Sequence, residues 1–313
     1  MEGPALNIHS RVYVSGHDGL VGSALLRTLG RAGLRNVLTR TRARLDLTRQ
    51  DAVERFFSRS RPEYVFHAAA LVGGIQANQQ RPGDFIYQNL AMQTNVIEAC
   101  RRHRVKRMIF FGSSCAYPKQ AKVPIREDQI LAGPIEPTNE PYAVAKIAGI
   151  RLCQAYNQQY GTDFVTVIPA NLYGPQDHFD DSGHVTAGLI RKFHAARLAG
   201  AAAVTLWGTG RPKRDFLFVD DLAQACLLLM RRRLRHDIFN VGSGQETSIA
   251  ELAALVSQVV GYKGRIDFDA SRPDGIPRRS LDNRRIAALG WRPKTELTDG
   301  LRLTYYWFRR TLA

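Results

Sequence analysis

The chain has 313 residues and a formal net charge of +16, and this length suffices for one large domain or two smaller ones with their own cores. Its hydrophobic content of 44% and charged content of 23% are ordinary for a globular protein, and no stretch approaches the ~20 apolar residues of a membrane span. The four cysteines are scattered without a CxxC pair, which argues against a disulfide framework or a zinc site. Because Met1 to Ser10 also lack the apolar run of a signal peptide, we expect a cytoplasmic protein with no membrane partner.

The positive charge gathers in three clusters, each after an apolar helical pattern or near the chain end, at 101–104, 231–233 and 309–310. Cations suit helix C-termini, so solvated helix ends are one interpretation, and attraction of an anionic small substrate is another. No nucleic-acid-binding motif accompanies the clusters, so we expect no nucleic-acid partner.

Strands alternate with helices through the first half of the chain. Short apolar strands are expected at 11–15, 36–39, 64–68, 107–111 and 164–168, and helices at about 20–32, 51–60, 91–103 and 142–160. This rhythm is typical of βαβ units, and strands without clear alternation suit a sheet covered on both faces. The prediction is an α/β fold with a Rossmann doubly wound parallel sheet.

After Gly174-Pro175 the pattern changes to polar, glycine-rich loops. A helix (186–198), a strand (204–207) and a basic loop (208–214) are expected next. A strand (216–219) and a helix (220–230) are then expected to return to the main sheet, and the chain ends in an amphipathic helix. We therefore predict a larger Rossmann domain (10–175 plus 216–243) and beside it a smaller C-terminal α/β domain (176–215 plus 244–313); the motifs described next make the first the NADP-binding domain and the second the substrate domain.

A glycine-rich loop, Gly16-x-x-Gly19-x-x-Gly22, follows the first strand and opens the first helix. Glycines there permit a tight turn and the close approach of a pyrophosphate to the helix N-terminus. The loop predicts a dinucleotide site; a glycine-rich turn without a ligand is the alternative.

The end of the second strand discriminates between the two nicotinamide cofactors. A carboxylate there would bind a ribose 2′-hydroxyl, whereas arginine accommodates a 2′-phosphate. Arg40, Arg42 and Arg44 precede the first carboxylate, Asp46. NADP(H) is therefore predicted, and a solvent-exposed basic loop is the alternative.

Tyr142 and Lys146 have the i, i+4 spacing that places them on one face of a helix, and Ser113 follows the fourth strand. An ammonium beside a phenol favours the phenolate, so Tyr142 should exchange a proton nearer neutral pH, as reduction of a carbonyl or oxidation of an alcohol requires. Cys115 adds a second acid or base at the same place. Taken singly, a Y-x-x-x-K arises often by chance and a cysteine is often a small buried apolar group.

Together these motifs resemble the extended short-chain dehydrogenase/reductase family, and 169–175 matches that family's segment below the nicotinamide. A narrower resemblance covers nearly the whole chain from about Arg11 and is to the GDP-L-fucose synthases of that family. The runs that carry it are 70–75, 111–118, 136–149, His184, 207–210, 214–221 and Pro273-Asp274-Gly275.

This resemblance implies that GDP-4-keto-6-deoxy-D-mannose is converted to GDP-L-fucose, by epimerisation at C3 and C5 and then NADPH-dependent reduction at C4. It assigns Cys115 as the base and His184 as the acid of epimerisation. Ser113 and Tyr142 would hydrogen-bond the C4 oxygen, and Lys146 would also bind the nicotinamide ribose.

The resemblance also implies contacts with each ligand, no metal and a homodimer. The NADP(H) contacts are Gly16, Gly19, Leu20, Val21, Gly22, Arg40, Arg42, Asp46, Leu47, Ala68, Ala69, Tyr142, Lys146, Pro169, Asn171, Leu172 and His184. The GDP-sugar contacts are Ser114, Asn171, Lys192, Trp207, Arg214, Asp274 and Arg279.

The chain departs from the family at a few positions, which leaves other functions open. Asp18 stands where bacterial members commonly carry a basic residue, and an acid there would repel a 2′-phosphate. Ala43-Arg44 replaces residues that are often acidic, and the Lys/Arg choice is shifted at Lys192 and Arg279. The alternatives are an epimerase that retains its hydride, similar to GDP-mannose 3,5-epimerase, and a 4-ketoreductase for another deoxyhexose nucleotide. A reductase fold used only for binding or regulation is disfavoured, since such proteins usually lose the tyrosine or lysine of the pair.

Overall fold

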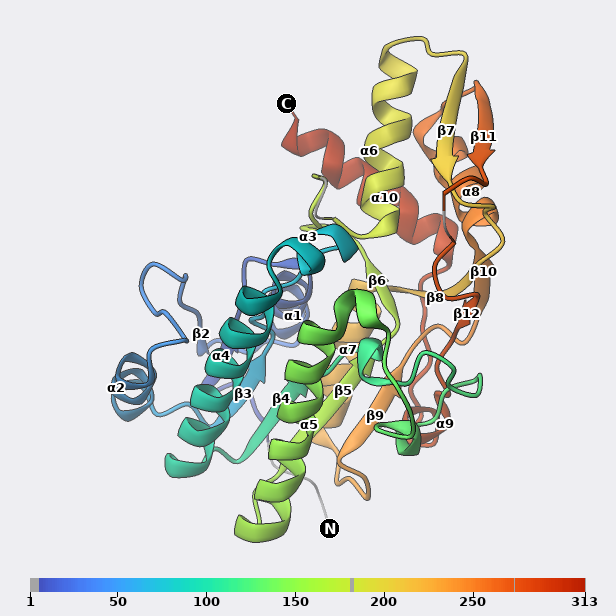
Figure 1. Ribbon diagram of the computed structural model, residues 1–313. Helices are drawn as coiled ribbons and strands as arrows, with labels where there is room; N and C mark the ends of the chain where they lie inside the picture. The colour runs from blue at the N-terminus through green and yellow to red at the C-terminus, as the bar shows by residue number, and fades with distance from the viewer. Residues whose placement is uncertain (1–5, 181–182, 273, 313) are drawn as a thin grey trace.

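Six parallel strands form the central sheet of the computed structural model, which describes residues 6–180, 183–272 and 274–312 (Figure 1). In spatial order they are β2 (Val37–Leu38), β1 (Val12–Ser15), β3 (Tyr64–His67), β4 (Arg107–Phe111), β5 (Phe164–Pro169) and β9 (Ile238–Val241). Each neighbouring pair is parallel. The chain passes from β1 to β2 on one side and then crosses to β3 on the other. The topological switch therefore lies at the carboxyl end of β1, where open α/β sheets bind their ligands.

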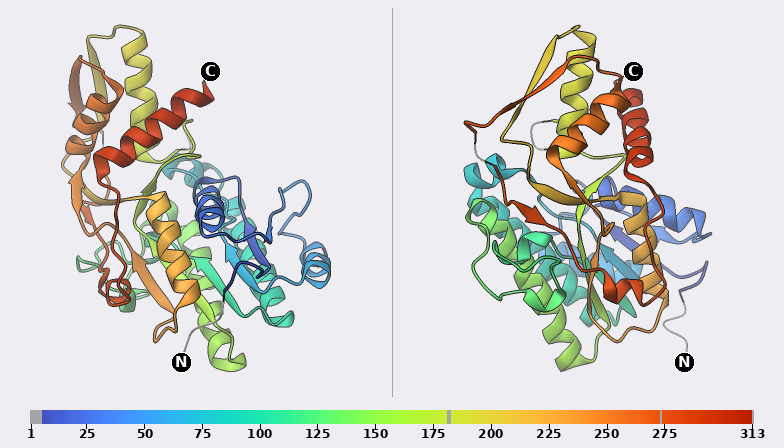
Figure 2. Two further views of the ribbon diagram at one scale, coloured as in Figure 1. Left: turned by 180° about the vertical axis from the view of Figure 1, so that it is seen from behind. Right: turned by 90° about the vertical axis from the view of Figure 1, so that its right-hand side faces the viewer.

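Helices cover both faces of this sheet, which explains why its strands are short, continuous apolar runs. On one face α1 (Leu20–Arg31) packs against α7 (Val219–Arg231), and on the other α4 (Pro82–Arg102) packs against α5 (Glu140–Tyr160) (Figure 2). The short helix α2 (Gln50–Ser60) lies beside α4. The predicted doubly wound Rossmann sheet is confirmed.

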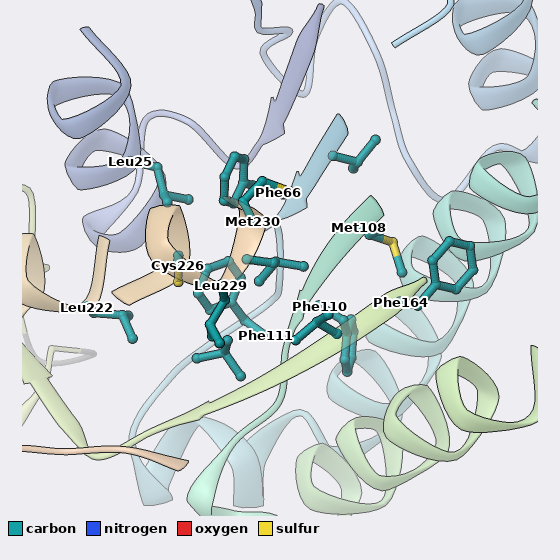
Figure 3. Close-up of a cluster of buried hydrophobic side chains, with 14 of the residues drawn as sticks. Leu25, Phe66, Met108, Phe110, Phe111, Phe164, Leu222, Cys226, Leu229 and Met230 are labelled. Atoms are coloured by element: carbon teal, nitrogen blue, oxygen red, sulfur yellow. The ribbon is translucent and has the colours of Figure 1, made fainter. Parts of the chain in front are cut away.

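Figure 3 shows buried side chains on both faces of the sheet, which form one continuous cluster. Side chains of α1 and α7 pack on one face, whereas Phe110 and Phe164 face α5 on the other, beside Lys146 and Tyr156. The labelled members of the cluster are Leu25, Phe66, Met108, Phe110, Phe111, Phe164, Leu222, Cys226, Leu229 and Met230. Each large side chain buried in this way contributes roughly 1.5–3 kcal/mol, so this cluster holds rigid the strand ends that carry the site.

A smaller lobe with its own apolar core lies above the carboxyl ends of the strands (Figure 1). One strand, β8 (Lys213–Phe218), is its centre: it pairs with three short strands and is followed by α7. Its other elements are β6 (Asn171–Tyr173), α6 (Val185–Leu198), β7 (Ala203–Trp207), β10 (Glu246–Ser248), α8 (Ile249–Val260), β11 (Arg265–Asp269), β12 (Arg278–Arg279) and α10 (Leu297–Thr311). The short helix α9 (Arg284–Ala287) packs instead against β9 of the main sheet. The smaller substrate-side unit expected from the sequence is thus present as α/β structure, while the exact domain boundaries remain a prediction.

One strand is placed differently from its prediction. The segment 216–219 was expected to return to the main sheet, but β8 pairs with β6, β10 and β12 instead, and β9 completes the main sheet. The reason is the alternation of its side chains: Phe216 and Phe218 enter the core of the small lobe, whereas Leu217 enters the main core. Because both faces of β8 are buried, each in a different core, its sequence is as continuously apolar as that of a main-sheet strand.

One helix is longer than predicted. The helix expected from Ala91 begins at Pro82, because proline is favourable at the first helical position and the polar Asn89 is buried. Asn89 donates to the carbonyls of Phe85 and Leu71, so it ties α4 to the loop after β3. The short helix α3 (Ile75–Gln80) precedes α4 and has no counterpart in the prediction.

Some predicted features lie outside the described residues, namely Pro273 of the 273–275 motif and positions 181–182 of the polar loop. Within 6–180, 183–272 and 274–312, no helix has the length and apolar character that a membrane crossing needs.

Candidate active site

The glycine loop forms a close-fitting cradle at the carboxyl end of β1. Gly16 has a φ of +66°, and a Cβ added to it would lie 2.7 Å from the Cα of Ala69 after β3. A Cβ on Gly22 would lie 1.9 Å from the carbonyl oxygen of Gly16. The first helix starts at Gly19 without a side-chain cap and without an acidic residue in its first turn. Only glycine fits at positions 16 and 22 of this turn, and the free N–H groups at the helix start suit a pyrophosphate.

The two arginines predicted to select the cofactor flank the end of β2. The Arg40 guanidinium lies 5.4 Å from the ring centroid of Phe56 and donates to the Thr39 carbonyl at 2.7 Å. Arg42 donates to Oε1 of Gln88 at 3.3 Å, and both arginines are exposed. Their planar groups are thus partly held in place while remaining open to an anion.

Asp46, the first carboxylate after β2, is partly buried. It accepts hydrogen bonds from the backbone N–H and the hydroxyl of Thr48, which hold the pKa of its carboxyl below its ordinary value. The remaining cofactor candidates lie in the first turn of α1, after β2 and β3, and at the end of β5 and the start of β6: Leu20, Val21, Leu47, Ala68, Ala69, Pro169, Asn171 and Leu172. Most of these positions share the carboxyl edge of the sheet.

The strand β4 ends in a short 3-10 turn, η1 (Ser114–Ala116), that carries the predicted base. Ser113 caps this turn, its hydroxyl accepting from the backbone N–H of Cys115 at 3.2 Å. The half-buried Cys115 faces the start of α5, where Nδ2 of Asn139 donates to its sulfur at 3.0 Å. Arg279 donates to the carbonyl of Ser114 at 2.9 Å from the other side. The turn is therefore fixed by contacts from three separate elements.

Tyr142 and Lys146 lie on α5 next to this turn. The buried Lys146 donates from Nζ to the Phe111 carbonyl at 2.9 Å, and its Nζ is 5.8 Å from the Tyr142 ring centroid. Burial lowers the pKa of the Lys146 amine to about 8. The structure thus brings Ser113, Cys115, Tyr142 and Lys146 together, as the sequence predicts.

The expected lowering of the Tyr142 pKa is wrong for the protein without ligands. Burial raises the pKa of the phenol, a negative charge on Cys115 would raise it further, and a hydrogen bond with Ser113 only partly offsets both. The reason is that the Lys146 ammonium is directed at a backbone carbonyl rather than at the phenol. Tyr142 therefore keeps its proton, which is the form that can donate one.

His184 stands at the N-cap of α6, and its side chain is 44% exposed. Its Nδ1 lies 2.8 Å from Oδ1 of the buried Asp177, and since a carboxylate only accepts, the imidazole donates there. Burial lowers the pKa of His184, but the hydrogen bond and the charge of Asp177 outweigh it and raise the pKa above its ordinary value. The pair holds the ring with Nε2 free of Asp177, in a form that is readily protonated.

Two arginines are adjacent on neighbouring strands of the small lobe. Arg214 of β8 and Arg279 of β12 are register partners, and burial lowers the pKa of both guanidinium groups. The charge of Arg279 lowers the pKa of Arg214 further. Two like charges held side by side favour an anion with two negative groups, such as a diphosphate.

The other predicted substrate contacts surround a more open part of the small lobe. Lys192 of α6 donates from Nζ to the Thr205 carbonyl on β7. Trp207 is 74% exposed, with the Arg272 guanidinium 5.2 Å from the centroid of its ring. Asp274 accepts from both the backbone N–H and the hydroxyl of Thr209, and these bonds hold its pKa below the ordinary value. An exposed indole of this size is a ready stacking surface for a planar group.

Sequence reasoning missed two residues of this site. Asn139 lies inside the 136–149 run but was given no role, and Asp177 was assigned only to a polar loop. A carboxylate a few residues before a candidate catalytic histidine was the available signal for Asp177. Asn139 carried none, because its contact with Cys115 depends on how η1 meets α5. In the described part of the chain, no cluster of three or more His, Cys, Asp or Glu side chains could hold a metal ion.

Comparisons with known proteins agree with this geometry. The family model of the NAD dependent epimerase/dehydratase family matches residues 12–242. The chain is 51% identical to GDP-L-fucose synthase 1 of Arabidopsis thaliana over 97% of its own length and 94% of that protein's. It is 51% identical to the GDP-L-fucose synthase of Sinorhizobium fredii, covering 97% and 96%. A GDP-L-fucose synthetase from Naegleria fowleri, solved with NADP bound, is 27% identical with a TM-score of 0.92, covering 99% and 97%. The chain therefore belongs to the NAD dependent epimerase/dehydratase family and, within it, to the GDP-L-fucose synthases.

Proposed function

We propose that this chain converts GDP-4-keto-6-deoxy-D-mannose to GDP-L-fucose, epimerising C3 and C5 and reducing C4 with NADPH. The observation that carries the proposal is the meeting of η1 with the start of α5. A thiol, a phenol, a hydroxyl and an amine converge there at the ligand-binding edge of the sheet. The first two suit two different proton transfers, so one site can serve two reactions.

The cradle at Gly16, Gly19 and Gly22 would hold the dinucleotide, and the clash that a side chain at Gly16 or Gly22 would make with the backbone supports this assignment. Arg40 and Arg42 would bind a 2′-phosphate, and their exposed guanidinium groups after β2 support this assignment. When bound, NADPH supplies the hydride that reduces the C4 carbonyl carbon. Lys146, buried and fixed beneath the tyrosine, would hold the nicotinamide ribose.

In the epimerisation, Cys115 as thiolate takes a proton from a ring carbon beside the C4 carbonyl. The electron pair of the broken C–H bond moves onto the C4 oxygen, where hydrogen bonds from Ser113 and Tyr142 stabilise it. His184 then returns a proton to the same carbon from the opposite face. Its raised pKa supports this assignment, because the imidazolium persists nearer to neutral pH.

In the reduction, the protein's task is to protonate the C4 oxygen as it becomes an alkoxide. Tyr142 is suited to this because burial keeps its phenol protonated until a stronger base forms beside it. Ser113 supplies a second hydrogen bond to the same oxygen. Replacing Tyr142 by Phe or Lys146 by Ala should each slow reduction by at least ~100-fold, the usual worth of a positioned proton donor.

The GDP part of the substrate would bind the small lobe. The adjacent guanidinium groups of Arg214 and Arg279 suit its diphosphate. Trp207, Lys192 and Asp274 would surround the sugar nucleotide, and Ser114 and Asn171 would lie nearer the sugar. The exposed indole supports this assignment, because a planar base can stack on it.

We also propose an oligomeric state and a cellular compartment for the protein. Exposed apolar residues on the outer face of α4 and α5, Tyr87 at 67% and Val144 at 38%, support a homodimer through these helices. Four free cysteines in the described chain support a reducing, cytoplasmic compartment. Light scattering of the purified protein would give the mass of the assembly.

The substrate can be tested with purified protein, GDP-4-keto-6-deoxy-D-mannose and NADPH. The expected product is GDP-L-fucose, with one NADPH consumed for each molecule formed. Turnover without stoichiometric NADPH would favour an epimerase that retains its hydride. Faster turnover of dTDP- or UDP-linked 4-keto sugars would contradict the choice of nucleotide and leave the epimerase and reductase roles standing.

A further inference from the structure

Asn139 occupies the N-cap position of α5, yet its side chain does not cap the helix. Asparagine at this position usually accepts a hydrogen bond from a backbone N–H of the first turn. Its Nδ2 instead donates to the sulfur of Cys115 at 3.0 Å. Its Oδ1 is buried and has no partner in the described part of the chain. The side chain thus forgoes a stabilising cap and leaves a buried carbonyl unpaired, which points to a role at the sulfur.

Other groups around Cys115 favour a negative charge on it. Arg279 of β12, buried behind η1, is attracted to a thiolate there. The 21-residue helix α5 directs its N-terminal end, with its partial positive charge, at η1. Neither of these is a donor in contact with the sulfur, whereas Asn139 is.

Two groups act in the opposite direction. An ionised Tyr142, on the same helix as Asn139, would repel a thiolate at Cys115. Glu136, before η3 (Pro137–Asn139), is a negative charge that competes with a thiolate for the attraction of Arg279. Its ion pair with Lys119, at 3.1 Å, weakens this competition. Of the groups around the sulfur, Asn139 acts at the shortest range, through a direct hydrogen bond.

We infer that Asn139 is a positioning residue that holds the Cys115 sulfur as a thiolate for proton abstraction, an inference that rests on the proposed function. When the thiolate takes a proton from the ring carbon, an S–H bond forms, the C–H bond breaks, and its electron pair moves onto the C4 oxygen. A half-turn of the amide then presents Oδ1, which has no other partner, to the new S–H group. An amide can therefore serve both protonation states of the cysteine, whereas a carboxylate can serve only the thiol.

The direct test is the pH dependence of alkylation at Cys115 by iodoacetamide in the whole protein. Cys100, Cys153 and Cys226 are buried, and Cys115→Ser measures their background. Asn139→Ser keeps a good N-cap residue but removes the amide, so it should fold. In Asn139→Ser we expect the pH at which the alkylation rate is half-maximal to lie about one unit higher than in the wild type. In Asn139→Asp this pH should be higher still.

A matched control is Ser248→Ala, which removes the capping box of α8 and touches nothing at Cys115. Its alkylation curve should coincide with that of the wild type. Curves for Asn139→Ser and Asn139→Asp that also coincide with the wild type would overturn the inference. If Asn139→Asp does not fold, Asn139→Ser alone decides.

Deuterium exchange at C3 and C5 of the keto sugar gives the second readout. In Asn139→Ser, the acidic limb of the pH profile of the exchange rate should move to higher pH by the same amount as the alkylation curve. KM should change little. Wild-type protein that shows the alkylation behaviour but no exchange would contradict the proposed function. The inference about the amide and the sulfur would then still stand, without its catalytic purpose.

Discussion

The Asp177 carboxylate binds Nδ1 of His184 at 2.8 Å, and Asp177 is buried while the imidazole is 44% exposed. The backbone N–H of His178 also donates to the same oxygen, at 2.9 Å, which holds the carboxylate still. A fixed carboxylate behind an exposed imidazole sets the orientation of the ring and keeps it protonated to higher pH.

Asp177→Asn should therefore lower the pKa of His184, because burial remains while the stabilising charge is lost. The rate of protonation by His184 above neutral pH should fall about tenfold for each unit by which the pKa falls. NMR titration of the His184 ring measures the change directly, and Asp299→Asn, an exposed residue of α10 paired with Arg302, is the control. An unchanged midpoint in Asp177→Asn would show that the pair does not govern the ring.

The same pair predicts a pH-dependent change in stability. A raised folded-state pKa contributes stability that is complete below the unfolded pKa and is lost as pH rises through the folded value. Asp177→Asn should thus lower Tm more at pH 5.5 than at pH 8.5. Equal losses at the two pH values would contradict this.

The lowered pKa of Lys146 leads to the opposite prediction, namely that stability increases with pH in the alkaline range. Its pKa is about 8 in the folded protein against 10.5 for the free side chain, so between these values the unfolded chain binds more protons and stability rises with pH. The Tm of the wild type relative to Lys146→Met should therefore increase from pH 7.5 to 9.5. The exposed Lys263→Met serves as control. A constant difference would mean that Lys146 is not destabilised as an ammonium.

We expect NADPH to be preferred over NADH because Arg40 and Arg42, which follow β2, are the residues proposed to bind the 2′-phosphate. The double variant Arg40→Ala/Arg42→Ala should lower the ratio of kcat/KM for the two cofactors by about tenfold or more. Asp18→Asn should raise the ratio, since it removes a negative charge from the exposed part of the glycine loop. Equal use of both cofactors by the wild type would mean that Asp18 outweighs the arginines.

The adjacent arginines should differ in their kinetic roles. Arg214→Ala removes a charge-assisted contact worth roughly 1.5–3 kcal/mol, so KM should rise by about one to two decades with a smaller effect on kcat. Arg279→Ala should lower kcat as well, because Arg279 also holds the carbonyls of Ser114 and Pro118 beside Cys115. Arg211→Ala, an exposed neighbour, is the control. Identical kinetic effects of the two changes would contradict the second role of Arg279.

The fold could be predicted from the sequence where local signals were strong. The glycine loop, the alternation of strands and helices and the Pro-Tyr start of α5 each identify one element. The placement of β8 could not be predicted, because alternate side chains such as Phe216 and Leu217 are buried in two different cores and leave no polar face. The start of α4 was missed for a related reason, since the buried Asn89 looks like a loop residue in the sequence.

The chemical groups of the site could also be predicted, but their electrostatic balance could not. The spacing of Tyr142 and Lys146 predicts their proximity, yet the pKa of Tyr142 depends on burial and on where the ammonium points. Asn139 contacts Cys115, which is distant in the sequence, and Asp177 contacts His184 because the loop between them folds back. Only the structure reveals these contacts.

The central claim is that one site performs two separable reactions, with Cys115 and His184 acting on the ring carbons and Tyr142 on the C4 oxygen. The most direct measurement is NMR of the sugar after incubation in D2O with the wild type, Cys115→Ser, His184→Ala and Tyr142→Phe. We predict deuterium at C3 and C5 with the wild type and, at a lower rate because one of the two hydrogen bonds to the C4 oxygen is lost, with Tyr142→Phe, which should fail in reduction. Cys115→Ser and His184→Ala should lose this exchange but still reduce an already epimerised ketone with NADPH. Unchanged exchange in both of these variants, or its loss in Tyr142→Phe alone, would contradict the account.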